Sequence, residues 1–313
     1  MSGDSDVIIE PHVEPARLAA SGTRLARLWR RLPVVVRAVI VGALVAQAGS
    51  IPSATLLVAN LKLWPDVPWS LPVVAAYLWL YWQYLRGRWW PHSTADARGR
   101  DLRARPVSPR IWRWSLLSGG LATAGVITLQ FVLARFVAFG YGFPSEFLQV
   151  PLFTLFSILL MLSAMAGIVE EAAFRGYMQT PIERRHGPVV AILVVSTLFA
   201  LAHLGDLQAR MTVARMCFIV IAAVYYGVLA HWTGSILPGI ALHVAGDAVG
   251  GGLIWWLSVH AGSGSSRQAE VALEWRDALT SRDGLAAIIL CGAAIWALRR
   301  LVVAAQSECH ATR

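Results

Sequence analysis

The stretch LQVPLFTLFSILLMLSAMAGIVEEAAFRGYM, residues 148–178, decides the fold class, because about twenty mostly apolar residues run directly into two adjacent glutamates. A run of this length and composition is typical of a helix that crosses a lipid bilayer, which needs about 20 apolar residues. The stretch is too long for one straight span, and its second half carries charge. We therefore expect a helix that is tilted or continues beyond the membrane.

The whole chain has the composition of a membrane protein. Of its 313 residues, 57% are hydrophobic and 14% are charged, whereas soluble domains usually carry about 25% charge. We predict an all-α, polytopic membrane protein with about eight transmembrane helices around a polar intramembrane cavity. The predicted spans are 35–60, 68–86, 112–138, 148–178, 188–205, 211–231, 235–258 and 284–301.

The positive charge, +9 in total, lies between the apolar runs rather than on one domain face, which argues against nucleic-acid binding. Arginines precede the first span, fill the loop after the second, follow the fourth and end the eighth. The loops near 61–67, 139–147 and 259–283 are poor in net positive charge. Because positively charged loops stay on the cytoplasmic side, we expect both termini to be cytoplasmic, in a plasma membrane protein.

These boundaries divide the chain into four parts. We expect a mobile, basic cytoplasmic tail at 1–32, whose end can form a short amphipathic helix on the membrane surface. The other parts are N-terminal transmembrane helices with a basic cytoplasmic loop at 33–147, a membrane core at 148–258, and an outer loop, last span and short tail at 259–313.

Two glutamates and an arginine form the first polar motif of the membrane core. Glu171 and Arg175 are four residues apart, so on a helix they face each other and can neutralise their charges. Glu170 lies about 100° further round the helix and is left without this partner. A carboxylate without a cationic partner in apolar surroundings is a candidate general base. The alternative is a charge cluster that ends a helix at the membrane surface.

Two later helices carry further polar residues. His203 follows Phe199 by four residues near the end of one span, and His243 and Asp247 are four apart inside another. Each of these residues by itself also fits a structural role, such as a buried polar pair that joins helices. Together they need burial away from lipid, which a single shared cavity provides. A glutamate with histidines is also what activation of a water molecule requires.

The order of these motifs resembles the CPBP family, which comprises CAAX proteases and bacteriocin-processing enzymes and is also called the Abi family. The similarity covers about residues 150–255 and includes the approach from Tyr226-Gly227 through Thr233-Gly234-Ser235-Ile236. The match runs through Glu170, Glu171 and Arg175, then Phe199 and His203, then His243 and Asp247.

The resemblance implies an intramembrane endopeptidase that hydrolyses a peptide bond of a membrane-associated protein or peptide at the bilayer. Glu170 and His203 would activate the water, while His243 and Asp247 would stabilise the oxyanion or complete the site. Glu171, Arg175 and Phe199 would support them. The resemblance leaves two mechanisms open. One uses the glutamate without metal; the other uses a divalent metal such as zinc, held by Glu170, His203, His243 and Asp247.

Residue 247 departs from the family's usual pattern, because many members have asparagine where this chain has Asp247. Asparagine can donate a hydrogen bond to an oxyanion, whereas an ionised aspartate can only accept one. The oxyanion role of Asp247 is therefore in doubt.

Two other functions stay open besides the protease. One is a non-catalytic protein of the same fold that binds a membrane peptide or confers bacteriocin immunity, and the other is a transporter with a polar ion path. The clustering of the polar residues in three helices favours a site over a path.

Overall fold

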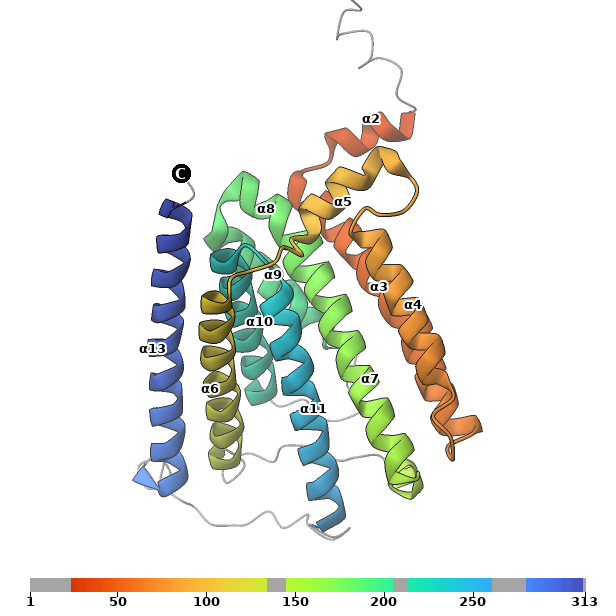
Figure 1. Ribbon diagram of the computed structural model, residues 1–313, viewed down its shortest axis with the longest axis vertical. Helices are drawn as coiled ribbons and strands as arrows, with labels where there is room; N and C mark the ends of the chain where they lie inside the picture. Colours follow the sequence, from red (N-terminus) through yellow and green to blue (C-terminus); the bar gives the residue numbers. More distant parts are fainter. Residues whose placement is uncertain (1–23, 134–144, 205–212, 261–279, 312–313) are drawn as a thin grey trace, which may run out of the picture.

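The computed structural model describes residues 24–133, 145–204, 213–260 and 280–311, and every regular element in these ranges is a helix. Figure 1 shows the helices as one bundle whose long members run along a common direction. The elements are α2 (Arg24–Arg31), α3 (Val34–Leu63), α4 (Ser70–Leu85), η1 (His92–Thr94), α5 (Ala95–Leu102), α6 (Pro109–Leu133), η2 (Ser145–Gln149), α7 (Leu152–Glu170), η3 (Glu171–Met178), α8 (Gln179–His186), α9 (Pro188–Ala202), α10 (Val213–Thr233), α11 (Leu237–His260) and α13 (Arg282–Ala311).

Six of the described helices are long and apolar enough to cross a bilayer: α3, α6, the continuous helix α7–η3–α8, α10, α11 and α13. Two further apolar helices are shorter, since α4 has 16 residues and α9 has 15. At 1.5 Å per residue, α9 is about 23 Å long, less than the ~30 Å hydrocarbon core of a bilayer. The prediction of an all-α, multi-pass membrane protein is confirmed, and eight is an approximate number of spans.

The observed boundaries differ from the expected ones mainly at the two ends of the chain. Helix α13 continues to Ala311, well beyond the expected end near residue 301. A short helix, α2, forms within the segment expected to be a tail, and α5 forms within the basic loop. Much of the expected loops 139–147 and 259–283, and the end of the span expected at 112–138, lie outside the described residues.

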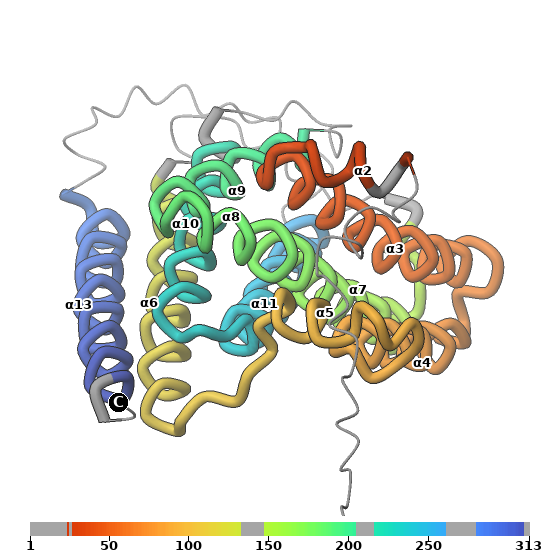
Figure 2. The backbone as a smooth tube through the Cα atoms, turned by 90° about the horizontal axis from the view of Figure 1, so that it is seen from above, coloured from red at the N-terminus to blue at the C-terminus, as the bar shows by residue number. Residues whose placement is uncertain are grey.

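The helix α7–η3–α8 occupies the middle of the bundle. Seen from above in Figure 2, α3 and α4 lie on one side of it, and α6 and α13 form the opposite edge. Helix α11 packs along α7, α10 along α9, and α13 along α6. The segment η3 contacts α3, α5, α9 and α10 as well as its own continuation. The two glutamates at the junction of α7 and η3 are therefore surrounded by protein.

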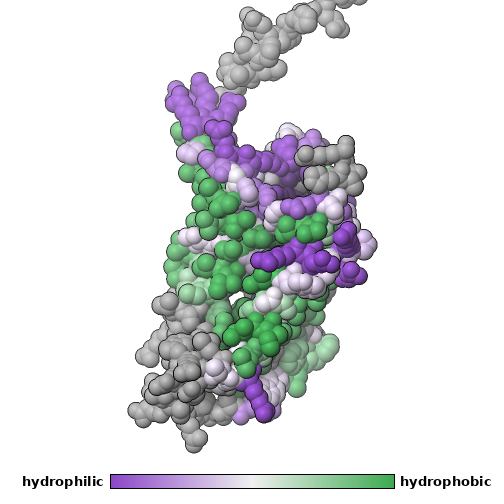
Figure 3. Space-filling model, turned by 90° about the vertical axis from the view of Figure 1, so that its left-hand side faces the viewer, coloured by the Kyte–Doolittle hydropathy of each residue, from purple (hydrophilic) through white to green (hydrophobic). Residues whose placement is uncertain are grey.

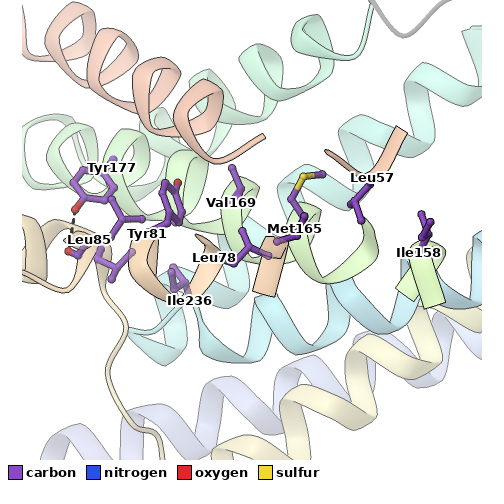
Figure 4. Packing of buried hydrophobic residues seen from close by; sticks show 12 residues of the cluster. Leu57, Leu78, Tyr81, Leu85, Ile158, Met165, Val169, Tyr177 and Ile236 are labelled. Atoms are coloured by element: carbon purple, nitrogen blue, oxygen red, sulfur yellow. Dashed lines mark hydrogen bonds between the residues drawn. The ribbon is translucent and has the colours of Figure 1, made fainter. Parts of the chain in front are cut away.

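A cluster of buried apolar side chains fixes this central helix against its neighbours. Leu78 and Tyr81 of α4 meet Val169 of α7 there, as Figure 4 shows. Large apolar side chains also point outward on the long helices, for example Phe153, which is 75% exposed, and Ile289, which is 69% exposed. Figure 3 shows an extended hydrophobic flank. An apolar outer surface of this kind is the surface that a lipid environment solvates.

One end of the bundle collects the described basic segments. In Figure 1, α2, α5, α8 and the C-terminal end of α13 lie at this end, and Figure 3 shows hydrophilic side chains gathered there. Helix α2 and the C-terminal end of α13 thus lie at the same end, which is the arrangement that the arginine distribution predicts. That this end is cytoplasmic stays a prediction.

Two arginines of the basic loop have structural partners. Arg98 is buried and donates hydrogen bonds to the carbonyl oxygens of Tyr84 and Trp89. The guanidinium of Arg103 pairs with both carboxylate oxygens of Glu183 on α8, at 3.0 and 2.9 Å. Arg98 thus ties the loop to the end of α4, and Arg103 attaches it to the membrane core, so these two side chains are not simply charges that face lipid headgroups.

Candidate active site

The helical geometry of the chain changes between the two adjacent glutamates, Glu170 and Glu171. Helix α7 ends at Glu170, and residues 171–178 form a π-helix, η3, before α-helical geometry resumes in α8. All eight residues of η3 are buried. π-Helical turns are rare and occur often at functional sites. The sequence pattern does not predict this change from α-helical to π-helical geometry.

Glu171 and Arg175 form a fully buried ion pair. Arg175 Nη1 lies 3.3 Å from Glu171 Oε1, and the two side chains are 1% and 0% exposed. Arg175 Nη2 also donates to the carbonyl oxygen of Ala223 on α10. The pairing that the four-residue spacing predicts is therefore present, although the turn is π-helical.

His243 of α11 connects this ion pair to the other acidic side chains. Its Nδ1 donates a hydrogen bond to Glu171 Oε1 at 3.1 Å. Its Nε2 lies 3.7 Å from Glu170 Oε2 and 3.5 Å from Asp247 Oδ2. The histidine thus stands among three carboxylates from two helices, and Glu171 fixes the orientation of its ring.

Glu170 differs from Glu171 as the sequence predicts, because it lacks an arginine partner. Its side chain is 22% exposed, and its Oε2 atom is buried without a hydrogen bond from the described residues. A buried carboxylate oxygen with an unused lone pair binds any water or polar substrate group that reaches it. Glu171 Oε2 is also buried without a hydrogen bond, but the other oxygen of Glu171 is engaged by Arg175 and His243, whereas no hydrogen bond from the described residues engages the Glu170 carboxylate.

His203 comes from the end of α9. Its Nδ1 donates a hydrogen bond to the carbonyl oxygen of Phe199 at 2.8 Å, which leaves Nε2 available as the second ring nitrogen. The ring also packs against Phe199, with centroids 4.5 Å apart. The ring lies close enough to the Glu170 carboxylate for the two side chains to interact electrostatically. Phe199 thus supports His203 both through its backbone and through its ring.

Aromatic rings hold the buried arginine in place. The Arg175 guanidinium carbon lies 4.5 Å from the ring centroid of Phe199 and 5.4 Å from that of Tyr226. The Tyr226 ring in turn stacks on the His243 imidazole, with centroids 5.3 Å apart and planes 9° apart. These contacts link α9, α10 and α11 around η3, so Phe199 and Arg175 occupy supporting positions.

A cavity of about 410 Å³ opens beside these residues, between α6, α9, α10 and α11. His203, His243 and Asp247 border it, together with Phe199 and Tyr226. Glu170 is not among the bordering residues, but its Oε2 lies 3.7 Å from Nε2 of His243, which borders the cavity. The structure thus brings all four predicted catalytic side chains into one region. The remaining wall is mostly aliphatic, a composition typical of small-ligand pockets.

The arrangement does not present a formed metal site. Among the described residues, no three histidine, cysteine, aspartate or glutamate side chains are grouped so that they could hold one ion. The Nδ1 atom of His243 is bonded to Glu171, and the oxygens of Glu170 and Asp247 stand more than 3 Å from Nε2. Zinc ligands lie about 2 Å from a shared ion and therefore a little over 3 Å from one another, a spacing that these two oxygens nearly keep with Nε2. The reaction steps below name only the side chains of this chain, and a chelator tests the metal-dependent mechanism.

Sequence reasoning missed the residues that bring the helices together here. Gly239 on α11 is one of them, because a methyl group at this position would lie 2.9 Å from Glu171 Oε2. Gly167 on α7 is another, since a methyl group there would lie 2.6 Å from Val244 Cγ2 and 3.2 Å from the carbonyl oxygen of Ile240. Their lack of a side chain was the only signal in the sequence. In the sequence, Tyr226 stands out only as part of the approach to the third motif.

We predict that Gly167→Ala lowers both stability and activity. The added methyl group must push α11 away from α7, and overpacking of this kind costs about 1–3 kcal/mol. The same shift moves His243 away from Glu170. Thermal unfolding in detergent measures the first effect. The matched control is Gly120→Ala on α6, where an added methyl group meets nothing within 4 Å. Equal unfolding temperatures for the two variants would contradict the prediction.

Comparison with known proteins agrees with this geometry. Residues 151–249 match the family model described as type II CAAX prenyl endopeptidase Rce1-like. This segment runs from the start of α7 into α11 and includes all the site residues named above. No curated protein and no solved structure gives a significant match to the chain. The resemblance to the CPBP family is thereby confirmed for this part of the chain.

Proposed function

Because residues 151–249 are an Rce1-like domain of the CPBP, or CAAX protease, family, we propose that the chain is an intramembrane endopeptidase. Its substrate is a membrane-associated protein or peptide, cut where the site meets the bilayer. One observation carries the proposal: a buried carboxylate without an arginine partner, Glu170, lies 3.7 Å from the ring of His243 beside a cavity that His203 also borders. We place the basic end of the bundle at the cytoplasmic face of a plasma membrane.

The first proposed step is activation of water. Glu170 accepts a proton from a water molecule that Nε2 of His203 orients, and the water oxygen bonds to the scissile carbonyl carbon. The electron pair of the carbonyl double bond moves onto its oxygen, which becomes an oxyanion. The carbon–nitrogen bond then breaks, and Glu170 passes its proton to the leaving amine. The net result is one water consumed and one peptide bond hydrolysed.

The supporting residues keep this machinery in place. The ion pair of Glu171 and Arg175 neutralises both charges inside the protein, and Glu171 also fixes the ring of His243. A protonated His243 presents an N–H to the cavity side, which favours the oxyanion. Asp247 lies 3.5 Å from the same nitrogen and balances the positive charge of the protonated ring, so the N–H stays available to the oxyanion. The buried pair thus positions His243, while His243 and Glu170 act on the substrate and the water.

The test is cleavage of a membrane-anchored peptide by the purified protein in lipid vesicles, followed by mass spectrometry. Wild-type protein should produce two fragments, and Glu170→Ala should produce none. If the wild-type protein binds the peptide without cutting it, the chain is a non-catalytic membrane-peptide-binding or immunity protein. If it moves protons or ions across the vesicle membrane instead, the polar residues form a transport path. Either result would reject the protease proposal.

A chelator separates the two mechanisms that the resemblance leaves open. We predict that cleavage is unchanged after prolonged treatment with EDTA or phenanthroline, because the described side chains do not converge on one ion. The measurement is the initial cleavage rate before and after treatment, with a zinc protease in the same buffer as the positive control. A loss of activity that added zinc restores would show that a metal takes part.

A further inference from the structure

Peptide-bond hydrolysis at this site needs a neutral hydrogen-bond donor for the oxyanion on the cavity side of His243. Asp247 cannot be this donor while it is ionised. Glu170 and Asp247 both face Nε2 of His243, at 3.7 and 3.5 Å, and both are acceptors. When the oxyanion forms, Glu170 holds the proton that it took from water, so the oxyanion meets the ionised carboxylate of Asp247 and one histidine. A second donor is therefore required to stabilise it.

Tyr226 lies next to this position. Its ring is nearly parallel to the imidazole of His243, with planes 9° apart, and it also contacts the guanidinium of Arg175. Glu171 bonds to both of these partners. The tyrosine ring is thus held by the same buried network that orients His243, and it borders the same cavity as His203 and Asp247.

The hydroxyl group of Tyr226 is free to bind a ligand. None of the hydrogen bonds among the described residues involves it. The hydroxyl oxygen lies near Gly246 on α11, because a methyl group at that glycine would be 4.0 Å from it. Gly246 directly precedes Asp247 in the sequence and also borders the cavity. The hydroxyl therefore lies beside the turn of α11 that carries His243 and Asp247.

We propose that the Tyr226 hydroxyl donates the hydrogen bond that stabilises the oxyanion, in the place of an amide at residue 247. This inference rests on the proposed protease function. As the water oxygen bonds to the carbonyl carbon, negative charge gathers on the carbonyl oxygen, and the tyrosine O–H donates to it. The phenol keeps its proton throughout, and Glu170 carries the proton that moves from water to the leaving amine.

Tyr226→Phe removes the hydroxyl and keeps the ring that stacks on His243 and Arg175. We expect kcat to fall by about 10²-fold, the usual effect of deleting one oxyanion donor, while KM and the unfolding temperature stay close to the wild-type values. The matched control is Tyr77→Phe, the same change on α4. An unchanged kcat in Tyr226→Phe would overturn the inference.

A double variant separates a catalytic from a structural role. Tyr226→Phe combined with Asp247→Asn places an amide donor at residue 247, and kcat should recover by about tenfold, roughly the worth of one hydrogen bond at 1.4 kcal/mol. A loss in Tyr226→Phe that this change does not restore, together with a lower unfolding temperature, would assign the tyrosine a packing role only.

The same assay distinguishes failure of the inference from failure of the proposed function. If wild-type protein and Tyr226→Phe cleave equally while Glu170→Gln does not, the protease function stands and the role of Tyr226 falls. If wild-type protein does not cleave, both fall.

Discussion

Glu170→Gln should give a folded protein whose turnover is at least about 10²-fold below that of the wild type, the lower range for loss of a general base. Glutamine keeps the size of the side chain but cannot take a proton from water. Because Glu170 makes no ion pair with an arginine and its Oε2 accepts no hydrogen bond from the described residues, its replacement should disturb the structure little. The measurement is turnover of a membrane peptide by the purified variant.

The unfolding curve of the variant and a second variant at His203 provide the controls for this result. The thermal unfolding curve of Glu170→Gln in detergent should overlay that of the wild type. His203→Ala should show a similar loss of turnover, because both side chains act on the same water. Full activity in a folded Glu170→Gln variant would end the protease hypothesis and favour a scaffold that binds membrane peptides.

Glu171→Gln should act mainly through stability, with a loss of about 3–5 kcal/mol, as is usual when one partner of a buried ion pair is removed. The guanidinium of Arg175 is 1% exposed, so it would remain charged without its counter-ion in a dry interior. His243 would also lose the acceptor of its Nδ1 hydrogen bond. Denaturation of the purified variant, monitored by thermal or chaotrope unfolding, measures the cost.

Two comparisons test the cause of this loss. Asp101→Asn breaks the ion pair of Asp101 with Arg184, whose side chains are 25% and 46% exposed, and should cost less than about 1 kcal/mol because solvent screens it. Adding Arg175→Met to Glu171→Gln removes the stranded charge and should recover part of the loss. If the exposed and buried variants unfold alike, the buried pair does not stabilise the core.

The sequence predicts the fold class and the local pairs because both depend on short-range patterns. Apolar runs of bilayer length predict the helices, and four-residue spacings predict the contacts of Glu171 with Arg175 and of His243 with Asp247, which the structure contains. The hydrogen bond from His243 to Glu171 joins residues 72 positions apart. No local pattern predicts such a contact, since it depends on how two helices rotate against each other.

The features that sequence reasoning missed share this physical cause. The π-helix η3 is stabilised by packing on all sides, because each of its eight residues is buried, and intrinsic propensity does not predict it. Arg98 and Arg103 were interpreted with the other loop arginines as topology signals, but they bond to Tyr84 and Glu183. Charge counting predicts on which side of the membrane a loop lies, but not which of its charges are neutralised by the fold.

The short length of α9 has a consequence for the lipids around the site. A helix of 15 residues is too short to match an undisturbed bilayer, and a bilayer relieves such hydrophobic mismatch by thinning locally. We therefore expect the polar headgroup layer to lie closer to the end of α9, which His203 follows. Thinning of this kind would shorten the path of water to the histidine, and it would let the polar backbone of a peptide approach the site without crossing the full depth of the hydrocarbon.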